Sequence, residues 1–449
     1  MRLPLFFLTP ALLVSFAVGQ ASTLTKERVL STVTWLAADE RAGRATGSPE
    51  ILAAGEWIAA RFAAAGLTQL QEGSWWHEFP LTGAMLDSTA MTVKLVRKHR
   101  DEVREFVLVP NVDVRQWAAA DVLAGEDEAC TVALFDDPVL QRLLTADSAR
   151  RPILCEVGDD HAYWLAAKGT RRVLGGRRQA ARPLFLLRKG ILPPAPVDGS
   201  EVAWTTTWSV AAPEKVDVPQ FNIVGLLPGT TKKDEYVIVS SHYDHLGVGR
   251  EVGGDRIYNG ADDNASGTTG VILLAEAFAK EPCARSLLFV CFTGEERGLL
   301  GSREFCARPP LPLDKVVANL NLEMLGRPEP GNEGKAWITG ADLSDFAAIA
   351  TESLQRGGVQ VIEFQMAAQL FAQSDNWSLA QKGVVAHSLS AGSLHRDYHQ
   401  PSDEVSRLDV DHMTVILRGL FEFTKDLGNR EQAPQWNEKG EARLQKTRR

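Results

Sequence analysis

The sequence predicts an α/β fold with a mixed, mostly parallel central sheet and helices on both of its faces, together with an inserted β-rich domain. From Asn222 onward, apolar runs of strand length alternate with segments of helical periodicity, which is typical of such a sheet. Between about residues 80 and 215 only short β-like runs occur, separated by clusters of Pro, Gly and Arg. The 449 residues are enough for two or three domains.

These changes of pattern divide the chain. We expect a leader at residues 1–21 and a main domain assembled from residues 22–79 and 216–428. The inserted domain covers residues 80–215, and a polar, charged tail follows at residues 429–449. A tail of this composition is expected to be poorly ordered.

The first part of the main domain is predicted to be helical. Apolar residues recur at helical spacing within residues 24–70. Ser48 before Pro49 is a favourable helix start, because a serine side chain caps the first turn and proline fits the first helical position. Gly66 suits the end of this helix.

The remaining elements follow from the same periodicities. In the inserted region the strand candidates are residues 91–96, 105–109, 130–135, 183–187 and 202–208. In the main domain the strand candidates are residues 236–240, 287–292, 316–322, 360–364 and 384–390. The helix candidates there are residues 267–280, 299–307, 343–357 and 410–427.

The N-terminus has the features of a secretory signal peptide. Arg2 precedes an apolar stretch from Leu3 to Val18, and small residues follow at a plausible cleavage site after Gly19 or Ala21. A retained anchor is the alternative, but the stretch is short and interrupted by prolines. No other stretch approaches 18 uninterrupted apolar residues, so we expect a secreted or periplasmic protein without a stable membrane anchor.

Composition restricts the classes of partner. The net charge is −9, which gives no support to a nucleic-acid partner. The five cysteines are an odd number, so at least one is unpaired within the chain, and the sequence does not determine any disulfide pairing. None of them has the paired spacing of a cysteine-based zinc site.

Two adjacent carboxylates, Glu295 and Glu296, follow the apolar run at residues 287–292. An isolated pair of this kind is usually a solvated strand end. A metal ion is the alternative, because it compensates charge next to a buried strand. One glutamate would then bind the metal while its neighbour transfers protons.

Four further segments favour the metal. Like the glutamate pair, they lie at strand ends or in adjacent loops of the α/β part, where ligands of such sheets gather. They are SHYDH at 241–245, NGADDNASG at 259–267, NLEM at 321–324 and YHQPSD at 398–403. Each alone has an ordinary interpretation, such as a helix cap or a loop histidine. Together they supply imidazole and carboxylate ligands, which suit zinc or a similar divalent ion and are enough for two ions sharing a bridge.

These segments, in this order, resemble the cocatalytic dizinc aminopeptidases, a family that includes bacterial leucyl aminopeptidases, glutamate carboxypeptidase, transferrin receptor and glutaminyl cyclase. The resemblance covers roughly residues 25–70 and 220–427 and implies a zinc-peptidase, phosphorylase/hydrolase-like fold. In such relatives a protease-associated domain occupies the place of the inserted region, although the match there is weak.

The resemblance implies a role for each motif residue. The implied ligands of two Zn²⁺ ions are His242 and Glu323 for the first, Glu296 and His399 for the second, and Asp262 as the bridge. Glu295 would be the general base and acid, and Asp244 would orient His242. The family also implies a cis peptide between Asp262 and Asp263.

Two positions depart from the family pattern. Many members carry Asp where this chain has Glu323, which leaves the geometry of the first zinc site open. A frequent Ser-Asp-His segment is Ser-Asp-Asn here, at residues 374–376, so a contact from its third position is in doubt. His245 and His395 are near the implied ligands, and we assign neither to the metals.

The resulting functional prediction is an exported dizinc metallo-exopeptidase, with aminopeptidase favoured, that hydrolyses peptide substrates with metal-activated water. The alternatives are a carboxypeptidase, a dipeptidase or a glutaminyl cyclase on the same scaffold. A cyclase uses one zinc, so the full ligand set argues against it. A non-catalytic binding protein, as in the transferrin receptor branch, is disfavoured because that branch has lost metal ligands. The preferred side chain and the oligomeric state are left open.

Overall fold

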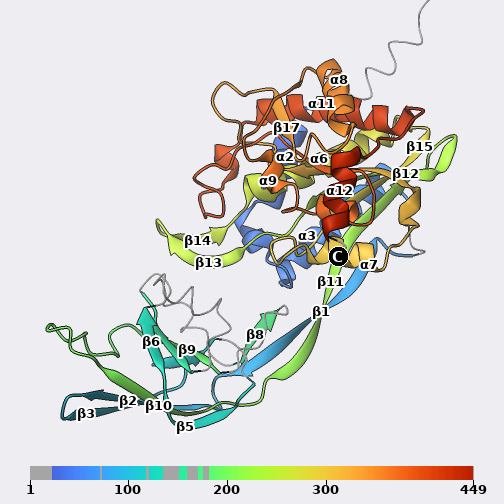
Figure 1. Cartoon of the computed structure of the whole chain (residues 1–449). Helices are drawn as coiled ribbons and strands as arrows, with labels where there is room; N and C mark the ends of the chain where they lie inside the picture. The colour runs from blue at the N-terminus through green and yellow to red at the C-terminus, as the bar shows by residue number, and fades with distance from the viewer. Residues whose placement is uncertain are drawn as a thin grey trace, which may run out of the picture. The chain divides into compact units, whose positions relative to one another are not determined.

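The computed structural model describes residues 23–70, 73–117, 121–134, 151–158, 170–174 and 182–447 (Figure 1). The predicted leader at residues 1–21 lies outside them. The chain forms two compact units, one of Met1–Phe79, Gln220–Gly249 and Asp255–Arg449, the other of Pro80–Pro219 and Arg250–Gly254. Within the described ranges, no helix combines the length and apolarity needed to cross a membrane.

The larger unit is built on a mixed sheet. Its strands are β11 (Glu214–Leu227), β12 (Lys232–His242), β15 (Arg285–Phe292), β16 (Val316–Glu323), β17 (Lys335–Ile338), β18 (Gln360–Val361) and β19 (Ala386–Ser390). They lie in the order β18-β17-β19-β16-β12-β15-β11. Strands β15, β12, β16 and β19 run parallel, whereas β11 and β17 pair antiparallel with β15 and β19. The predicted mixed, mostly parallel sheet is confirmed.

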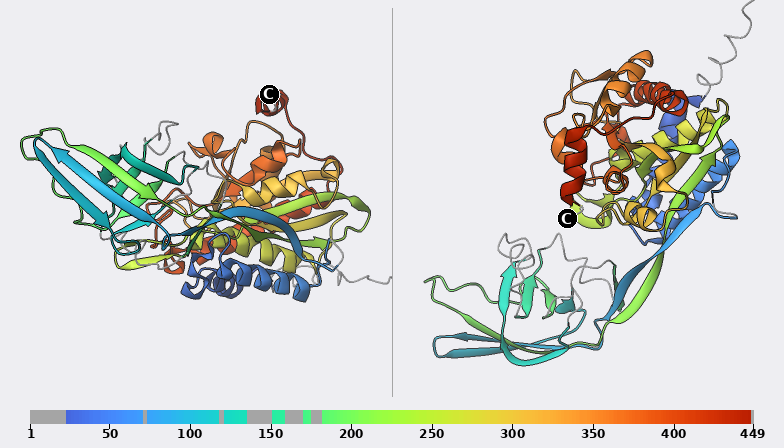
Figure 2. Two further views of the ribbon diagram at one scale, coloured as in Figure 1. Left: turned by 90° about the horizontal axis from the view of Figure 1, so that it is seen from below. Right: turned by 45° about the vertical axis from the view of Figure 1, so that its right-hand side comes forward.

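Helices cover both faces of this sheet (Figure 2). One face packs against α2 (Lys26–Leu36), α3 (Pro49–Ala65), α6 (Gly267–Phe278), α8 (Phe346–Arg356) and α11 (Val410–Asn429). The other face packs against α7 (Leu300–Ala307), α10 (Asn376–Ala380) and α12 (Glu438–Thr447). Strand β15 shows why both faces are apolar: Leu287 and Phe289 belong to the first core, and Leu288 and Val290 to the second.

The N-terminal helix signals are confirmed. The hydroxyl of Ser48 accepts the N–H of Ile51 at 3.2 Å, and Pro49 is the first residue of α3. The helix ends at Gly66, whose φ of 87° is the left-handed conformation that glycine adopts without strain. Sequence periodicity did not predict β17 or the C-terminal helix α12.

The C-terminal tail contains ordered structure. Helix α12 carries the buried Leu444, and Trp436 before it donates its indole N–H to the carbonyl of Gly383. The Trp436 ring also lies 5.2 Å from the ring of His387 and 6.2 Å from that of Phe371. The tail therefore packs on the main domain, because it contributes a few large apolar side chains within a charged sequence.

The smaller unit is β-rich. One sheet has the order β3-β2-β10-β5, formed by β2 (Thr92–His99), β3 (Glu102–Leu108), β5 (Ala124–Ala129) and β10 (Ala203–Ser209). The other has the order β4-β9-β7-β6, formed by β4 (Val114–Gln116), β6 (Thr131–Leu134), β7 (Ile153–Glu156) and β9 (Leu184–Leu187). Its core includes Leu95, Phe185 and Trp208.

Candidate metal centre

The site is assembled at the carboxyl ends of parallel strands. Strand β12 ends at His242, β16 ends at Glu323, and the glutamate pair follows the end of β15. Because these strands are parallel neighbours, their carboxyl ends meet at one edge of the sheet. This places Nε2 of His242 only 3.4 Å from Oε2 of Glu323.

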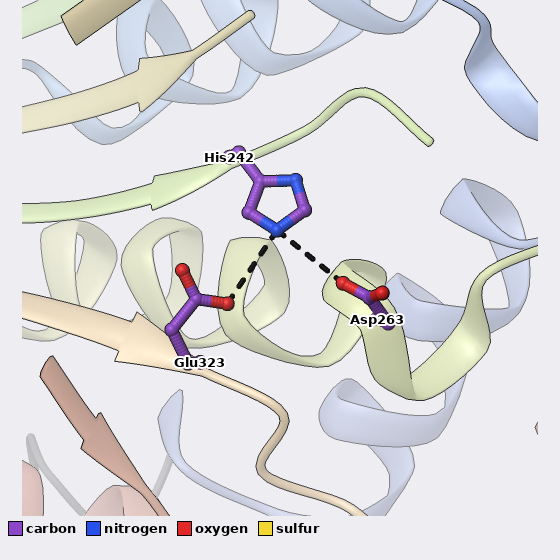
Figure 3. Close-up of side chains that lie close together, drawn as sticks. All are labelled: His242, Asp263 and Glu323. Atoms are coloured by element: carbon purple, nitrogen blue, oxygen red, sulfur yellow. Dashed lines mark ion pairs between the residues drawn. The ribbon is translucent and has the colours of Figure 1, made fainter. Parts of the chain in front are cut away.

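The carboxylate of Asp263 lies at the centre of the site. Its Oδ1 is 3.3 Å from Nε2 of His242, as Figure 3 shows, and its Oδ2 is 3.1 Å from Nε2 of His399. Nε2 of His399 is also 3.3 Å from Oε2 of Glu296. One Asp263 oxygen therefore faces His242 and Glu323, and the other faces His399 and Glu296.

The structure corrects the predicted bridge from Asp262 to Asp263. Oδ1 of Asp262 accepts the N–H of Gly326 at 2.7 Å, and its Oδ2 lies 3.2 Å from Nε2 of His395, whereas the carboxylate near His242 and His399 is that of Asp263. The cis peptide likewise joins Asp263 and Asn264 instead of Asp262 and Asp263. Adjacent side chains of this non-helical turn diverge, and the sequence does not distinguish which of two consecutive aspartates faces the histidines.

Two residues within the quoted motifs hold this turn in place. The carboxylate of Asp403 accepts the backbone N–H groups of both Asp262 and Asp263 at 3.1 Å. The side-chain amide of Asn264 donates to Oε2 of Glu323 at 2.7 Å and to the carbonyl of Leu322 at 2.9 Å. Sequence reasoning gave Asp403 and Asn264 no role, because hydrogen bonds to backbone groups leave no signal in a motif.

Glu323 is fixed despite its longer side chain. Its Oε1 accepts hydrogen bonds from the Ser374 hydroxyl and from the side-chain amide of Asn321, and its Oε2 accepts from Asn264. Ser374 is the first residue of the Ser-Asp-Asn segment. The third, Asn376, is buried and bonds Ser388 and the Phe371 carbonyl, so it makes its contacts away from the ligand cluster.

Asp244 contacts His242 mainly through its backbone. Nδ1 of His242 lies 3.1 Å from the Asp244 carbonyl and 3.7 Å from the Asp244 carboxylate. The carboxylate itself accepts the N–H of Glu295 at 3.1 Å and the hydroxyl of Thr46 at 2.9 Å. Asp244 thus connects the orientation of His242 to the position of Glu295.

A second imidazole adjoins the Glu296 side of the cluster. Nδ1 of His245 lies 2.8 Å from Oε1 of Glu296, which is a hydrogen-bond distance, and 3.8 Å from Oδ2 of Asp263. Nε2 of His399 is within 3.3 Å of both carboxylates, yet it has no hydrogen-bond partner among the residues that the structure describes. We interpret His245 as the donor that holds Glu296 and His399 as the ligand predicted from sequence.

The two adjacent glutamates have opposite electrostatics. Removal from bulk water raises the pKa of Glu295 well above its usual value, and the neighbouring carboxylates Glu323 and Glu296 add to this. For Glu296, burial and Asp263 also favour the protonated form, but His245 and His399 outweigh them and lower its pKa. Adjacent acids with diverging pKa values are typical of separated acid–base and ligand roles.

The histidines are arranged for positive charge. Burial disfavours the charged form of His399, but its contacts with Asp263 and Glu296 prevail and raise its pKa to about 10. His242 behaves in the same way: burial opposes protonation, while the surrounding carboxylates raise its pKa well above the usual value. The carboxylate cluster therefore favours cations at both of its ends.

The donor spacing fits zinc. A tetrahedral zinc ion with ligand bonds of about 2.0–2.1 Å has ligand atoms about 3.3–3.4 Å apart. The observed nitrogen–oxygen distances around Asp263 range from 3.1 to 3.4 Å. Two groups that could hold an ion share Asp263, one with His242 and Glu323 and the other with His245 and Glu296. His399, the histidine predicted from sequence, also lies 3.1 Å from Asp263 and 3.3 Å from Glu296.

A cleft of about 640 Å³ opens beside these groups. His242, Asp263, Glu295 and Glu323 line one part of it. Its other walls are mainly apolar or hydroxyl-bearing, and include Met324, Trp337, Thr339, Leu370, Ser388, Leu394 and Tyr398. Among the described residues that line the cleft there is no lysine or arginine, so these residues form an apolar pocket next to a cluster of carboxylates.

Comparisons with known proteins find similar aminopeptidases. A leucine aminopeptidase of Trichophyton verrucosum, named as probable, is 30% identical over 231 residues, covering 48% of this chain and 60% of that protein. The aminopeptidase from Aneurinibacillus sp. strain AM-1 aligns with a TM-score of 0.56 at 18% identity, over 94% of this chain and 96% of that one. BSAP, a zinc aminopeptidase from Bacillus subtilis, aligns with a TM-score of 0.57 at 16% identity, over 91% and 96%.

These comparisons support different conclusions about the chain. At 16–18% identity, the structural alignments establish the fold of the chain. The sequence match to the Trichophyton protein spans only 60% of that relative's length. The family model of peptidase family M28 matches residues 222–424, the range that holds His242, Asp263, Glu295, Glu296, Glu323 and His399. Over these residues the chain is similar to peptidase family M28.

Proposed function

We propose that this protein is an exported dizinc aminopeptidase. The observation that supports this most directly is the Asp263 carboxylate, which presents one oxygen to each of two histidine–carboxylate groups beside Glu295. His242 and Glu323 would hold one zinc ion, Glu296 and His399 the other, and Asp263 both. When bound, the two ions would polarise the scissile carbonyl and lower the pKa of a water molecule.

Glu295 is the proposed general base and acid. It lines the cleft without belonging to either ligand group, and burial raises its pKa well above the usual value of a glutamate, which favours a role in proton transfer. It would take a proton from the attacking water and give it to the leaving amine. Asp244 would keep it in place, because its carboxylate accepts the Glu295 N–H.

The cleft favours substrates with a free amino terminus and an apolar first side chain. A carboxypeptidase would need a basic side chain to bind the terminal carboxylate, and none of the described residues that line this cleft is a lysine or an arginine. Trp337, Leu370 and Leu394 provide the apolar surface, and the name of the Trichophyton relative as a leucine aminopeptidase agrees with this choice.

Export is the remaining part of the proposal. It is supported by the leader at residues 1–21, with its charged residue, apolar stretch and small residues at the cleavage site. A secreted or periplasmic location would place the enzyme among peptides. N-terminal sequencing of the mature protein from the producing cell would test this, and an intact Met1 would exclude cleavage.

The enzymatic proposal is tested with a matched pair of variants. We expect purified protein to cleave leucyl-nitroanilide, to leave N-blocked peptides intact and to lose activity with a chelator. Glu295→Gln should retain two zinc ions and lose about 10²–10⁴-fold in kcat. Glu304→Gln, which alters a half-exposed glutamate of α7, should behave as wild type. Cleavage of blocked peptides only, or activity that survives both the chelator and Glu295→Gln, would refute the proposal.

A further inference from the structure

A buried arginine far from the family match contacts the loops of the metal centre. Arg44 is 0% exposed. Its Nε donates to the carbonyl of Tyr243 at 2.9 Å, and its Nη2 donates to the carbonyl of Gly260 at 3.1 Å. Its Nη1 donates to the carbonyls of Leu36 and Asn259. A single guanidinium group therefore connects three separate parts of the backbone.

Two of these parts carry the residues of the first zinc site. Tyr243 lies between His242 and Asp244, and residues 259–260 immediately precede the turn that holds Asp263. The backbone of the same segment adds to the connection, because the carbonyl of Arg44 accepts the N–H of His245 at 3.2 Å. The segment thus fixes the spacing between the chain at His242 and the chain before Asp263.

A second side chain of the segment reaches the site directly. The buried Thr46 donates its hydroxyl to Oδ2 of Asp244 at 2.9 Å, while Oδ1 of Asp244 accepts the N–H of Glu295. Gly43 allows this close approach: its φ is +64°, and a Cβ there would lie 2.3 Å from the carbonyl oxygen of Tyr258.

The charge of Arg44 is unusual for a purely structural residue. All four acceptors are neutral carbonyls, and among the described residues no carboxylate forms an ion pair with it. Burial lowers its pKa to about 10, while nearby carboxylates, Asp244 and Asp403 first, oppose that decrease. It remains charged at neutral pH, in a place where an unpaired cation is costly unless its hydrogen bonds are satisfied.

We propose that residues 43–46 form a positioning element for the metal centre, in which Arg44 fixes the ligand-bearing loops and Thr46 fixes Asp244. The inference rests on the metal site proposed above. Metal affinity depends on ligand positions within a few tenths of an ångström. The segment precedes residues 222–424, so the family match does not include it.

The chain offers a matched control for Arg44. Arg285 is also buried and donates to the carbonyls of Leu427, Arg430 and Glu431, and its Nε pairs with the Glu235 carboxylate at 2.6 Å. It lies at the start of β15, at the opposite end of that strand from Glu295. A lysine at either position would retain the charge and lose the planar fork of donors. Both variants should therefore lower stability, but only Arg44→Lys should disturb the metal.

Three measurements on the full chain test the proposal. They are the zinc affinity from competition with a chelator, the visible absorption spectrum of the Co²⁺-loaded protein, and the midpoint of urea unfolding. We expect Arg44→Lys to weaken zinc binding about 10–100-fold and to alter the Co²⁺ spectrum. Arg285→Lys should lower the urea midpoint with wild-type affinity and spectrum. Wild-type zinc affinity and spectrum in Arg44→Lys, or an equal loss in Arg285→Lys, would overturn the proposal.

A second pair of variants decides the matter if Arg44→Lys does not fold. Thr46→Val removes the hydroxyl bond to Asp244 at nearly constant volume, and Thr46→Ser retains it. We expect about tenfold weaker zinc binding in the valine variant and recovery in the serine variant; equal affinity in both would overturn the proposal. Wild-type protein that binds two zinc ions but cleaves no peptide would refute the aminopeptidase function alone, because the affinity comparison remains valid.

Discussion

The assignment of Asp263 as the bridge predicts a large difference between two adjacent isosteric substitutions. Asp263→Asn removes the charge of the carboxylate whose oxygens lie 3.3 Å from Nε2 of His242 and 3.1 Å from Nε2 of His399. Loss of a residue that only supports a ligand typically costs 10–100-fold in metal affinity. A ligand shared by two ions should exceed that limit at both sites, which is more than about 2.7 kcal/mol for each ion.

Asp262→Asn is the control at the neighbouring position. The amide oxygen of asparagine would still accept the N–H of Gly326, which the Asp262 carboxylate accepts at 2.7 Å. The change removes only the charge facing His395, at 3.2 Å. We therefore expect a stability loss of about 1 kcal/mol and retention of both zinc ions.

Elemental analysis after dialysis, together with chelator competition, distinguishes the two variants. Asp263→Asn should retain fewer than two zinc ions per chain, and Asp262→Asn should retain two. Circular dichroism of both variants establishes that the fold is intact. Two tightly bound ions in Asp263→Asn, combined with loss of zinc from Asp262→Asn, would refute the assignment and restore Asp262 as the bridge.

Three further predictions concern the surroundings of the site. Ser374→Ala removes the hydroxyl that donates to Glu323 and should weaken zinc binding about 10–100-fold in chelator competition; unchanged affinity would contradict this role. Trp436→Ala should lower the free energy of unfolding by about 2–3 kcal/mol in urea titrations, because it removes a half-buried ring that packs the tail on the main domain. A decrease of less than about 1 kcal/mol would show that the tail contributes little to the stability of the protein. Burial lowers the pKa of His387 to about 4, below the ordinary value of 6.5, so between these pH values the unfolded chain binds a proton that the folded chain does not. The free energy of unfolding should therefore fall by about 3 kcal/mol from pH 6.5 to pH 4. In urea titrations, the midpoint of His387→Gln should decrease less over this pH range than that of the wild type.

Much of the fold could be predicted because the two faces of the sheet impose a simple pattern. In β15, every residue is buried, so the strand appears as a continuous apolar run, as expected for a parallel strand covered on both faces. The same topology brings His242 and Glu323 together, because both end parallel strands. Strand β17 was missed because its four residues, Lys335–Ile338, are too few to show a period.

Other features could not be predicted because they depend on backbone direction and on backbone hydrogen bonds. The choice between Asp262 and Asp263 is made by a turn in which Asp263 has φ −105° and ψ 95°, a conformation that the residue order does not specify. The contacts of Arg44 are all with carbonyl groups, which every residue possesses, so no sequence motif marks its partners. Such contacts emerge only from the folded chain.

Glu295 and Glu296 are adjacent in the chain but have different proposed roles in the same hydrolysis reaction. Glu296 is placed beside His245 and His399, which outweigh the opposing effect of Asp263 and favour the ionised form that suits a metal ligand. Glu295 faces the cleft, where desolvation favours its protonated form and suits a proton carrier. Because the two residues are consecutive in the chain, a shift of this backbone segment would displace the proposed proton carrier and the proposed metal ligand together. The Asp244 carboxylate strengthens this by binding the Glu295 N–H, and Thr46 extends the same support to the N-terminal segment. A substitution that shifts this backbone should therefore impair proton transfer and metal binding together, whereas Glu295→Gln separates them.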